Sequence, residues 1–173
     1  GNGQLGDGTT TSRTTPVSVL GINTAVAVTA GRFHSCALLA DGTARCWGSN
    51  GNGQLGDGTT TLRTAPASVG GLAGAIALSG GSAHTCAMIS GGTAKCWGNN
   101  GNGQLGDGTG TQRLNPVAVS GVVSAVGIDA AFMGNYTCVL NSNGTASCWG
   151  VNSNNQLGDG TATQRLVPTA VSG

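Results

Sequence analysis

The sequence predicts an all-β protein made of three β-propeller blades, each a four-stranded antiparallel sheet, with one extra edge strand. Glycine contributes 33 of 173 residues, which excludes a helical bundle because each glycine costs about 1 kcal/mol in a helix relative to alanine. Threonine, valine and turn-forming Asn-Gly and Asp-Gly pairs dominate instead, as in strands joined by turns. The segment 51–59 recurs at 1–9, 101–109 and, shortened, 154–161. A repeat of about 50 residues is typical of a propeller or a solenoid.

The repeats divide the chain into four units, of which the last is partial. Repeat 1 spans residues 1–50, repeat 2 spans 51–100, repeat 3 spans 101–152, and residues 153–173 hold only the loop and edge strand of a fourth. Three blades leave two exposed ends. We therefore expect an incomplete ring, or a repeat array that completes itself with another copy.

Repeat 1 illustrates the expected order of elements. Residues 1–11 form a polar loop that is too rich in glycine for a strand. Residues 15–19 are a short extended run, and Pro16 confines it to a sheet edge because proline cannot donate a ladder hydrogen bond. Residues 25–30 alternate alanine with valine or threonine, and the small alanines suit the crowded inner rim of a propeller. One edge strand and three inner strands are thus expected in each repeat.

A hairpin with two cysteines closes each repeat. Residues 35–39 and 43–47 are expected to be strands joined by Ala40-Asp41-Gly42, since a three-residue loop ending in glycine is typical of a type I turn with a bulge. In that register two cysteines face each other with Cα atoms about 4.5–5.5 Å apart, a distance that a disulfide can bridge. The same spacing in all repeats predicts three disulfides and an oxidising, extracellular compartment. The pairs are Cys36–Cys46, Cys86–Cys96 and Cys138–Cys148.

The charge pattern argues against nucleic-acid and membrane binding. The seven Lys and Arg residues are dispersed and the net charge is +1, whereas phosphate neutralisation needs a basic cluster. No apolar run approaches the ~20 residues that span a bilayer. Residues 1–173 contain no signal peptide and Gly1 lies inside a repeat, so we expect the chain to be a segment of something that begins earlier.

The repeated motifs resemble the regulator of chromosome condensation repeat. In repeat 1 they read Gln4-Leu-Gly-Asp-Gly-Thr9, Pro16-Val-Ser-Val19, Ala30-Gly-Arg-Phe-His-Ser-Cys-Ala-Leu38, Asp41-Gly-Thr43 and Cys46-Trp-Gly48. The resemblance implies a propeller of about seven blades, in which sequence repeats are offset from structural blades and strands from the two ends close the ring. A full ring of that family needs roughly twice the repeats present here.

The resemblance also bounds the function. The paired cysteines look like those of an extracellular bacterial branch, not those of the nuclear exchange factor. Nothing in the chain matches an acidic loop or insertion that acts on a small GTPase. The family is similar also to a secreted β-lactamase inhibitor that uses one propeller face, but no residue here identifies that target.

An aspartate and an arginine recur six residues apart in every repeat. A bidentate ion pair that pins the glycine-rich loop is the interpretation we favour. Calcium is the alternative, because aspartate and backbone carbonyl oxygens are hard ligands, but one acid per repeat is few and a nearby arginine opposes a cation. The pairs are Asp7/Arg13, Asp57/Arg63, Asp107/Arg113 and Asp159/Arg165. We expect no other cofactor.

Histidine and tryptophan each have a structural interpretation and a functional one. His34 and His84 lie two residues before a cysteine, which suits a hydrogen-bonding turn residue better than a zinc ligand, because zinc sites show closer cysteine pairs. One tryptophan adjoins the second cysteine of each repeat. Packing between blades is favoured for it over a carbohydrate-stacking row. These residues are Trp47, Trp97 and Trp149.

Repeat 3 departs from the pattern between its first inner strands. Residues 130–136 carry two extra residues and include Phe132, Met133 and Tyr136. Loops on a rigid scaffold are where binding specificity diverges, so these residues are candidates for ligand binding or for contact with another subunit, and gap filling is the equal alternative. The triplets that begin at Asn135 and Asn143 match the N-glycosylation acceptor pattern.

Catalysis is not expected. Glutamate is absent, only two histidines are present, and general acid–base chemistry needs positioned titratable groups. The favoured function is a non-enzymatic extracellular module that associates with itself head to tail into a ring or filament. In that hypothesis the C-terminal edge strand, residues 167–171, completes the first blade of another copy. The alternative is a fragment of a longer propeller that binds a protein partner through one face.

Overall fold

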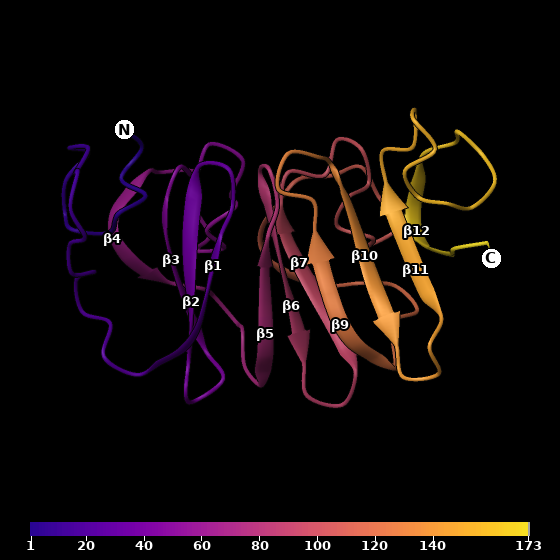
Figure 1. Ribbon diagram of the computed structural model, residues 1–173, viewed down its shortest axis with the longest axis horizontal. Helices are drawn as coiled ribbons and strands as arrows, with labels where there is room; N and C mark the ends of the chain where they lie inside the picture. The colour runs from indigo at the N-terminus through magenta and orange to yellow at the C-terminus, as the bar shows by residue number, and fades with distance from the viewer. Residues whose placement is uncertain (173) are drawn as a thin grey trace.

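The computed structural model describes residues 1–172 and contains three four-stranded antiparallel sheets, the blades, standing side by side (Figure 1). Blade 1 consists of β1 (Ala25–Ala30), β2 (His34–Leu39), β3 (Ala44–Gly48) and β4 (Arg63–Ser68). Blade 2 consists of β5 (Ala75–Gly80), β6 (His84–Ile89), β7 (Thr93–Gly98) and β8 (Arg113–Ala118). Blade 3 consists of β9 (Ala125–Ala130), β10 (Tyr136–Asn141), β11 (Ala146–Gly150) and β12 (Arg165–Ala170). The predicted all-β propeller class is therefore confirmed.

Each blade takes three strands from one sequence repeat and its outer strand from the next. In blade 1 the strand order is β1-β2-β3-β4, and β4 lies beyond the boundary between repeats 1 and 2. The prediction that each edge strand belongs to the same blade as the inner strands of its own repeat was wrong, because the edge strand completes the preceding blade. The offset between sequence repeats and blades is the one that the family resemblance implies.

The offset between repeats and blades changes the outcome for two strands that the sequence predicts. Residues 15–19 form no strand, because the strand they would pair with, the β3 of a preceding blade, does not exist within residues 1–172. The C-terminal segment is not an unpaired edge strand: β12 pairs with β11, with Ser147 opposite Ala170 and Cys148 opposite Thr169. The copy of the edge-strand sequence that has no sheet is thus the first and not the last.

The predicted hairpin register is confirmed. Cys36 faces Cys46, and the same pairing joins β6 to β7 and β10 to β11. The turn after β2 closes with the Leu39 N–H donating to the Thr43 carbonyl at 2.9 Å, and Gly42 has a φ of +76°. That left-handed conformation explains why glycine ends the turn. The facing cysteine Cα atoms are 4.1 Å apart, slightly closer than expected.

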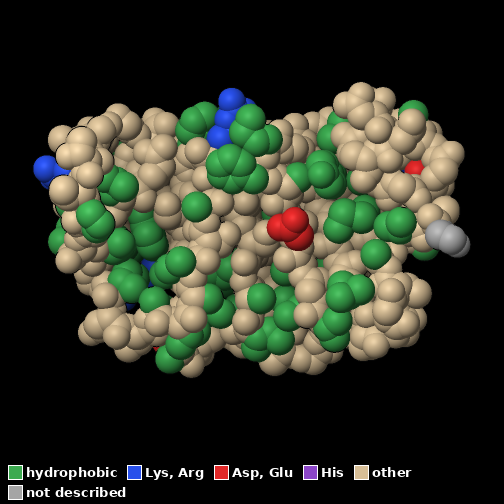
Figure 2. All heavy atoms as spheres, in the orientation of Figure 1, with side chains coloured by type: hydrophobic (Ala, Val, Ile, Leu, Met, Phe, Trp, Pro, Cys, Tyr) green, Lys and Arg blue, Asp and Glu red, His purple; other side chains and the backbone are tan. Residues whose placement is uncertain are grey.

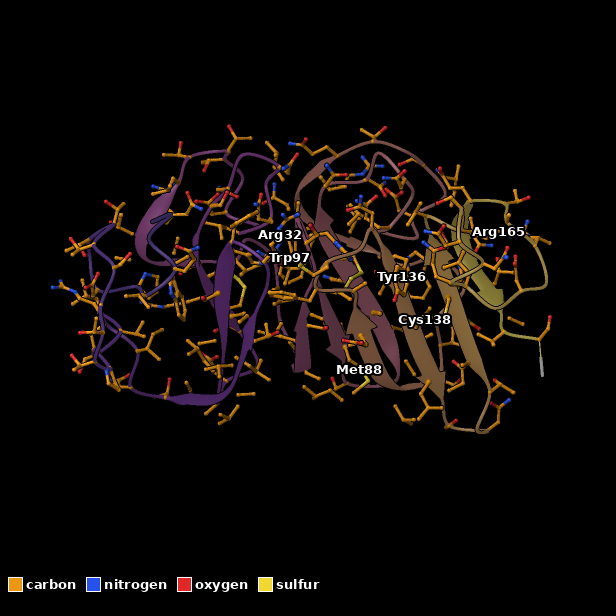
Figure 3. All side chains as sticks on the ribbon, turned by 45° about the horizontal axis from the view of Figure 1, so that its top comes forward. Arg32, Met88, Trp97, Tyr136, Cys138 and Arg165 are labelled. Carbon is orange, nitrogen blue, oxygen red and sulfur yellow. A yellow bond between two sulfur atoms is a disulfide. The ribbon has the colours of Figure 1, made fainter. Side chains whose placement is uncertain are left out.

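The blades pack against each other through two hydrophobic cores, each centred on a fully buried tryptophan. Trp97 lies between the ribbons of blades 1 and 2 (Figure 3), and Trp149 occupies the equivalent place between blades 2 and 3. The first core is formed by Cys36, Leu38, Ala44, Cys46, Leu55, Val69, Leu72, Ala75, Ala87 and Trp97. The second is formed by Cys86, Met88, Ala94, Cys96, Leu105, Val119, Val122, Ala125, Ala130, Val139 and Trp149. Alanines and disulfides fill the narrow space beside each indole.

The blades form an open row rather than a closed ring. The inner strands β1, β5 and β9 contact one another in sequence, and the two ends of the chain lie at opposite ends of the row (Figure 1). No helix within residues 1–172 is long and apolar enough to cross a membrane.

Candidate functional site

The repeated glycine-rich loop is built around a buried asparagine. Asn50 follows β3 and is 1 % exposed. Its Nδ2 lies 3.1 Å from Asp57 Oδ1 and 3.1 Å from the carbonyl oxygens of Thr59 and Thr61, and its Oδ1 accepts from the Leu55 N–H at 3.0 Å. Asn100 and Asn152 make the same contacts in the next two loops. One carboxamide therefore organises each of these three loops, because it satisfies backbone groups from both sides of the loop.

These asparagines were missed in the sequence. Asn50 stands in the run Ser49-Asn50-Gly51-Asn52, where asparagine is expected as an ordinary turn residue. The signal that distinguishes it is its recurrence three residues after Trp47, Trp97 and Trp149.

The aspartate and arginine of each loop form an ion pair, but the arginine donates to Oδ2 alone, so the predicted bidentate contact with both oxygens is not formed; in the first loop Arg13 donates to Asp7 Oδ2 from both Nε and Nη2, at 3.0 and 2.9 Å. In the second loop Arg63 Nε lies 2.8 Å from Asp57 Oδ2, while Asp57 Oδ1 accepts from the Thr59 N–H at 3.0 Å and from Thr59 Oγ1 at 2.7 Å. The threonine therefore occupies the oxygen that a second arginine bond would need. The other pairs have N···O distances of 2.9 Å (Arg13–Asp7), 2.8 Å (Arg113–Asp107) and 2.6 Å (Arg165–Asp159).

Hydrogen bonding keeps these carboxylates charged. Burial acts to raise the pKa of Asp57, but the hydrogen bonds from Thr59 and Arg63 outweigh it, and the pKa lies below its usual value. The same balance lowers the pKa of Asp159 to about 2, with Arg165 the largest favourable partner. Carboxylates held in this way support the loop and offer no proton for exchange near neutral pH.

The loops offer little to a metal ion. Both oxygens of Asp57 already accept hydrogen bonds, and within residues 1–172 no three His, Cys, Asp or Glu side chains come together as a metal-binding group. All six cysteines are paired in disulfides. Calcium at the loops stays the alternative to the ion pair, to be tested by experiment.

Three of the four loops fasten the blade that follows them. We call residues 1–12, 51–62, 101–112 and 153–164 the latch loops. The Gln54 carbonyl accepts from Trp97 Nε1 at 2.9 Å and from Thr85 Oγ1 at 2.7 Å, and the Gly58 N–H donates to the Leu114 carbonyl at 3.0 Å. The loop that joins β3 to β4 of blade 1 is thereby held on three strands of blade 2.

The same latch operates at the other positions. The Gln104 carbonyl accepts from Trp149 Nε1 and Thr137 Oγ1, both at 2.9 Å. At the start of the chain, the Gln4 carbonyl accepts from Trp47 Nε1 at 2.7 Å and from Ser35 Oγ at 3.0 Å. Trp47 is 4 % exposed and the other two indoles are fully buried. The tryptophans therefore bind the latch-loop carbonyls, Trp97 and Trp149 also pack between blades, and none of the three presents a stacking surface for a sugar.

The two histidines extend the latch across the blade interface. His34 Nε2 lies 2.8 Å from Thr85 Oγ1, and His84 Nε2 lies 3.0 Å from Thr137 Oγ1. Since each threonine hydroxyl donates its single hydrogen to a glutamine carbonyl, it must accept from the histidine, which assigns the proton to Nε2. Nδ1 of each ring is buried without a partner among the described residues.

Burial keeps both rings neutral. It lowers the pKa of His34 to about 4, and burial together with the charge of His34 lowers the pKa of His84 to about 3. In the third repeat Tyr136 takes the corresponding position and is half-buried. The histidines are thus links between blades at the start of β2 and β6, and not turn residues.

Blade 3 exposes a face that is covered in the other two blades. Leu38 and Met88, at equivalent places on β2 and β6, are 3 % and 8 % exposed because the following blade packs on them, whereas Leu140 on β10 is 48 % exposed. A shallow apolar depression of about 370 Å³ surrounds it, lined by Gly127, Ile128, Asp129, Cys138, Val139, Leu140 and Ala146. At the opposite end Val28 on β1 is 76 % exposed. Figure 2 shows hydrophobic side chains on all three blades with few charges among them.

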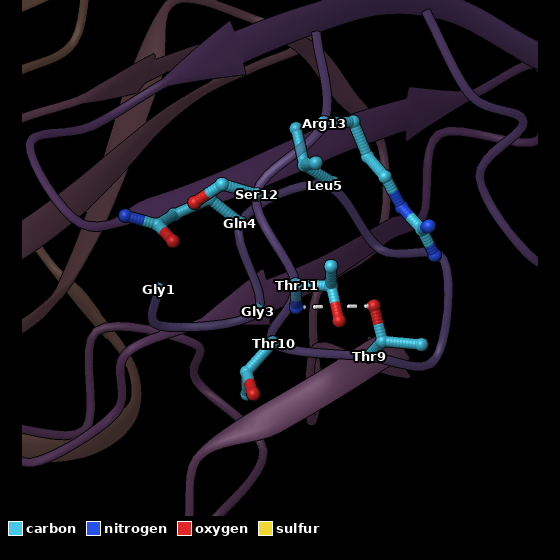
Figure 4. Close-up of a pocket in the computed structure, with 9 residues that line it drawn as sticks. All are labelled: Gly1, Gly3, Gln4, Leu5, Thr9, Thr10, Thr11, Ser12 and Arg13. Carbon is cyan, nitrogen blue, oxygen red and sulfur yellow. Dashed lines mark hydrogen bonds between the residues drawn. The ribbon is translucent and has the colours of Figure 1, made fainter. Parts of the chain in front are cut away.

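A pocket of about 330 Å³ opens in the first latch loop (Figure 4). Its lining includes Leu5, Thr9 and Thr11, the counterparts of the residues that contact Asn50 in the second loop. Leu5 is 40 % exposed, whereas Leu55 is fully buried. The pocket therefore corresponds to the place that an asparagine side chain fills in the other loops.

The unusual loop of repeat 3 projects into solvent. Phe132 and Met133 are 50 % and 71 % exposed, so they do not plug a gap in the core. In the equivalent loop of blade 1, the Arg32 guanidinium lies 4.9 Å from the centre of the Phe33 ring, a cation–π contact. Binding or subunit contact at Phe132, Met133 and Tyr136 stays a prediction.

Four-stranded blades, each fastened by the glycine-rich loop that precedes it in the sequence, define a β-propeller repeat protein. The family profile "Regulator of chromosome condensation (RCC1) repeat" matches residues 1–38, 41–88 and 92–140, and a second profile of the same description matches residues 25–54 and 75–104. The chain belongs to the regulator of chromosome condensation repeat family, in a form with a disulfide in every blade.

Solved structures with the same fold include human WBSCR16, with 24 % identity and a TM-score of 0.82 over 99 % of this chain and 46 % of that one. Yeast RCC1 (Prp20) bound to Kap60 shows 20 % identity and a TM-score of 0.84 over 100 % of this chain and 43 % of that one. Prp20p of Saccharomyces cerevisiae, studied with its binding to Gsp1p and histones, matches equally, with 45 % of that chain covered. The chain thus spans less than half the length of each. No curated protein gives a significant match.

Proposed function

We propose that this chain is a non-enzymatic, extracellular protein-interaction module that associates end to end with a second copy of itself. Propellers of this repeat family typically act as protein-interaction modules. The yeast relative binds Kap60, and its binding to Gsp1p and histones has been studied, which supports a binding role without identifying a partner for this chain. The non-enzymatic part of the proposal is supported by the ion pairs that occupy the loop aspartates and by the disulfides that occupy all six cysteines.

The exposure of Leu140 carries the proposal. Its counterparts Leu38 and Met88 are covered by a following blade, and the exposed surface around it is apolar. Blade 1 presents the complementary side, where Val28 is exposed while its counterparts Leu78 and Ile128 are partly buried against a preceding blade. The end of blade 3 therefore fits the start of blade 1 in the way that blade 1 already fits blade 2.

Length is compatible with a ring of two copies. The chain covers 46 % of the human structure with the same fold, so two copies amount to nearly the length of that relative. A head-to-tail contact closes if the rotation returns to the start and otherwise continues as a filament.

The junction differs from the exchange of a C-terminal strand, because β12 is already paired. The latch loops at the two ends share the sequence Gln-Leu-Gly-Asp-Gly-Thr, at residues 4–9 and 156–161. Residues 4–9 already hold Trp47 and Ser35 of their own blade 1. Association therefore requires residues 1–18 of one copy to give way to the C-terminal latch loop of the other.

Light scattering of the purified chain tests this proposal. We expect a mass of two or more copies, and a monomer after Leu140→Asp, because a charge on the apolar end face opposes docking. Leu62→Asp, at a site 41 % exposed in a latch loop, is the matched control and should keep the wild-type mass. A wild-type chain that is monomeric at all concentrations would overturn self-association.

The extracellular assignment rests on the three disulfides, since such bonds persist in oxidising compartments. Rapid alkylation labels free thiols of the native protein in its source, and it is expected to find all six cysteines protected as disulfides. Labelling of the three pairs at the outset would contradict this assignment.

A second candidate function is binding of a different protein through the loop of residues 130–136. The exposure of Phe132 and Met133 favours it, because exposed aromatic and methionine side chains are typical of interface centres. Phe132→Ser with Met133→Ser is expected to leave the light-scattering mass unchanged. A fall to monomer in that variant would instead place the loop in the contact between copies.

A further inference from the structure

We infer that Asn143 is an acceptor for an N-linked glycan and that Asn135, although it has the same sequence pattern, is not. Both precede a threonine at the second following position, as the acceptor pattern requires. The two sites differ completely in their surroundings, and that difference is what the inference uses.

Asn143 lies at the exposed tip of the β10–β11 hairpin. Its Oδ1 accepts from the Thr145 N–H at 3.1 Å and from Thr145 Oγ1 at 2.7 Å, so asparagine and threonine are held together on one surface. Asn143, Gly144 and Thr145 are all exposed. Among the described residues, nothing accepts a hydrogen bond from Asn143 Nδ2, the atom to which a glycan would be attached.

The triplet that begins at Asn135 is not exposed to a transferase in this way. Its threonine, Thr137, is fully buried in β10. The Thr137 hydroxyl donates to the Gln104 carbonyl at 2.9 Å and accepts from His84 at 3.0 Å. The Asn135 carbonyl accepts from the Val151 N–H at 2.9 Å. An enzyme that must grip the whole triplet would have to undo the latch of blade 3.

The position of Asn143 is compatible with a following blade. Asp41 and Gly91 occupy the same turn position in blades 1 and 2 and remain exposed although another blade packs beside them. The neighbouring Gly42 and Gly92 carbonyls accept from Ala75 and Ala125 of the next blade, so it is the glycine and not the residue before it that faces that blade. A glycan at Asn143 therefore leaves the proposed end-to-end contact open.

The turn also tolerates a change at this side chain. Asp41 Oδ1 accepts from the Thr43 N–H at 2.9 Å and from Thr43 Oγ1 at 2.6 Å, as Asn143 Oδ1 does from Thr145. In blade 2 Gly91 has no side chain, and the same register is kept. Neither the amide nitrogen nor the side chain itself is needed for the hairpin.

The reaction is transfer of a glycosyl group from a lipid-linked diphosphate donor. Asn143 Nδ2 forms the bond to the anomeric carbon, the bond from that carbon to the diphosphate oxygen breaks, and the diphosphate leaves with the electron pair. One proton of the amide passes to a base of the transferase. No oxidant or reductant takes part.

Folded, disulfide-bonded chain incubated with a purified oligosaccharyltransferase and its lipid-linked donor tests the inference. Peptide mass spectrometry is expected to find the glycan on Asn143 alone. Asn143→Gln should abolish the modification, and Asn135→Gln, the matched control, should leave it unchanged. Chain that has been reduced and alkylated, and that circular dichroism shows to be unfolded, should be modified at both sites.

Two outcomes would overturn the inference. One is a glycan on Asn135 of the folded chain, since the buried Thr137 is the reason for excluding it. The other is no glycan on Asn143 of the folded chain, whether or not the unfolded chain accepts one. Both outcomes are independent of the mass of the assembly, so they do not depend on self-association.

Discussion

Trp97 Nε1 and Thr85 Oγ1 donate to the same acceptor, the backbone carbonyl of Gln54, at 2.9 and 2.7 Å. The carbonyl belongs to the loop that joins β3 to β4 of blade 1, and both donors belong to blade 2. Because one buried oxygen accepts both hydrogen bonds, the contributions of the two donors to stability are coupled.

Removing either donor is therefore expected to weaken the contact between blades. Trp97→Phe and Thr85→Val should each lower the free energy of unfolding by roughly 1–3 kcal/mol, since each leaves a polar group short of a partner. Equilibrium denaturation of the two variants and of the double variant gives the coupling energy. Strict additivity of the two effects would contradict a shared acceptor.

The buried asparagine that organises each of the last three latch loops should matter more than any other polar residue there. Asn100→Ala removes a partner from Asp107 and from the backbone of Leu105, Thr109 and Thr111, and a loss of about 2–3 kcal/mol is expected. Asn102→Ala is the matched control, because its side chain makes no hydrogen bond among the described residues. Urea unfolding should show the control within about 0.5 kcal/mol of wild type, and equal losses would sink the assignment.

Acid should destabilise the chain through the histidines before it affects the aspartates. The folded pKa values of about 4 for His34 and about 3 for His84 lie below the ordinary 6.5, so the unfolded chain binds more protons and stability falls as the pH drops below 6.5. By pH 4 each histidine contributes a loss of roughly 3 kcal/mol. The aspartate pKa values lie below 3.8, so their loss comes at lower pH.

Denaturation at pH 7, 5.5 and 4.5 checks this prediction. His84→Gln is expected to flatten the dependence in this range by about half, since one of the two groups is removed. An unchanged slope in that variant would show that the histidines are not responsible.

The three disulfides should not contribute equally. Each closes a short hairpin, for which the expected stabilisation is about 2–3 kcal/mol. Cys86 and Cys96 are fully buried between blades, whereas Cys138 lies at the open end and is partly exposed. Replacing Cys86 and Cys96 by alanine should therefore lower the melting temperature more than replacing Cys138 and Cys148. The opposite order would contradict the packing role of the buried pair.

Calcium is expected to have no effect on the latch loops. Both oxygens of each loop aspartate accept hydrogen bonds, and the arginine remains beside them. The melting temperature should be the same with millimolar calcium and with a chelator. A chelator-sensitive transition would revive the metal alternative.

Local chemistry made much of the fold predictable, and long-range pairing accounts for what was not. The glycine that ends each hairpin turn sets the register, so the pairing of Cys36 with Cys46 followed from a few neighbouring residues. Residues 15–19 and Arg165–Ala170 have similar sequences, yet only the second is a strand. The second segment has a neighbouring strand to pair with and the first does not, and the presence of such a strand cannot be predicted from the residues of the segment itself.

The site shows the same division. The spacing of Asp57 and Arg63 was enough to predict their contact, but the bidentate geometry failed because Thr59 takes the second oxygen. Asn50 was indistinguishable from the turn asparagines around it. The latch to Trp97 escaped prediction because its acceptor is a backbone carbonyl 43 residues away.

The direction of the latch has a consequence for synthesis on the ribosome. Latch loop 51–62 is translated before blade 2, and loop 101–112 before blade 3. The glutamine carbonyl that accepts from the threonine and tryptophan of each new hairpin has therefore already been synthesised when that hairpin emerges. Chains grow from the N-terminus and domains fold in that order, so the nascent protein can be assembled one blade at a time, each blade serving as the template for the next.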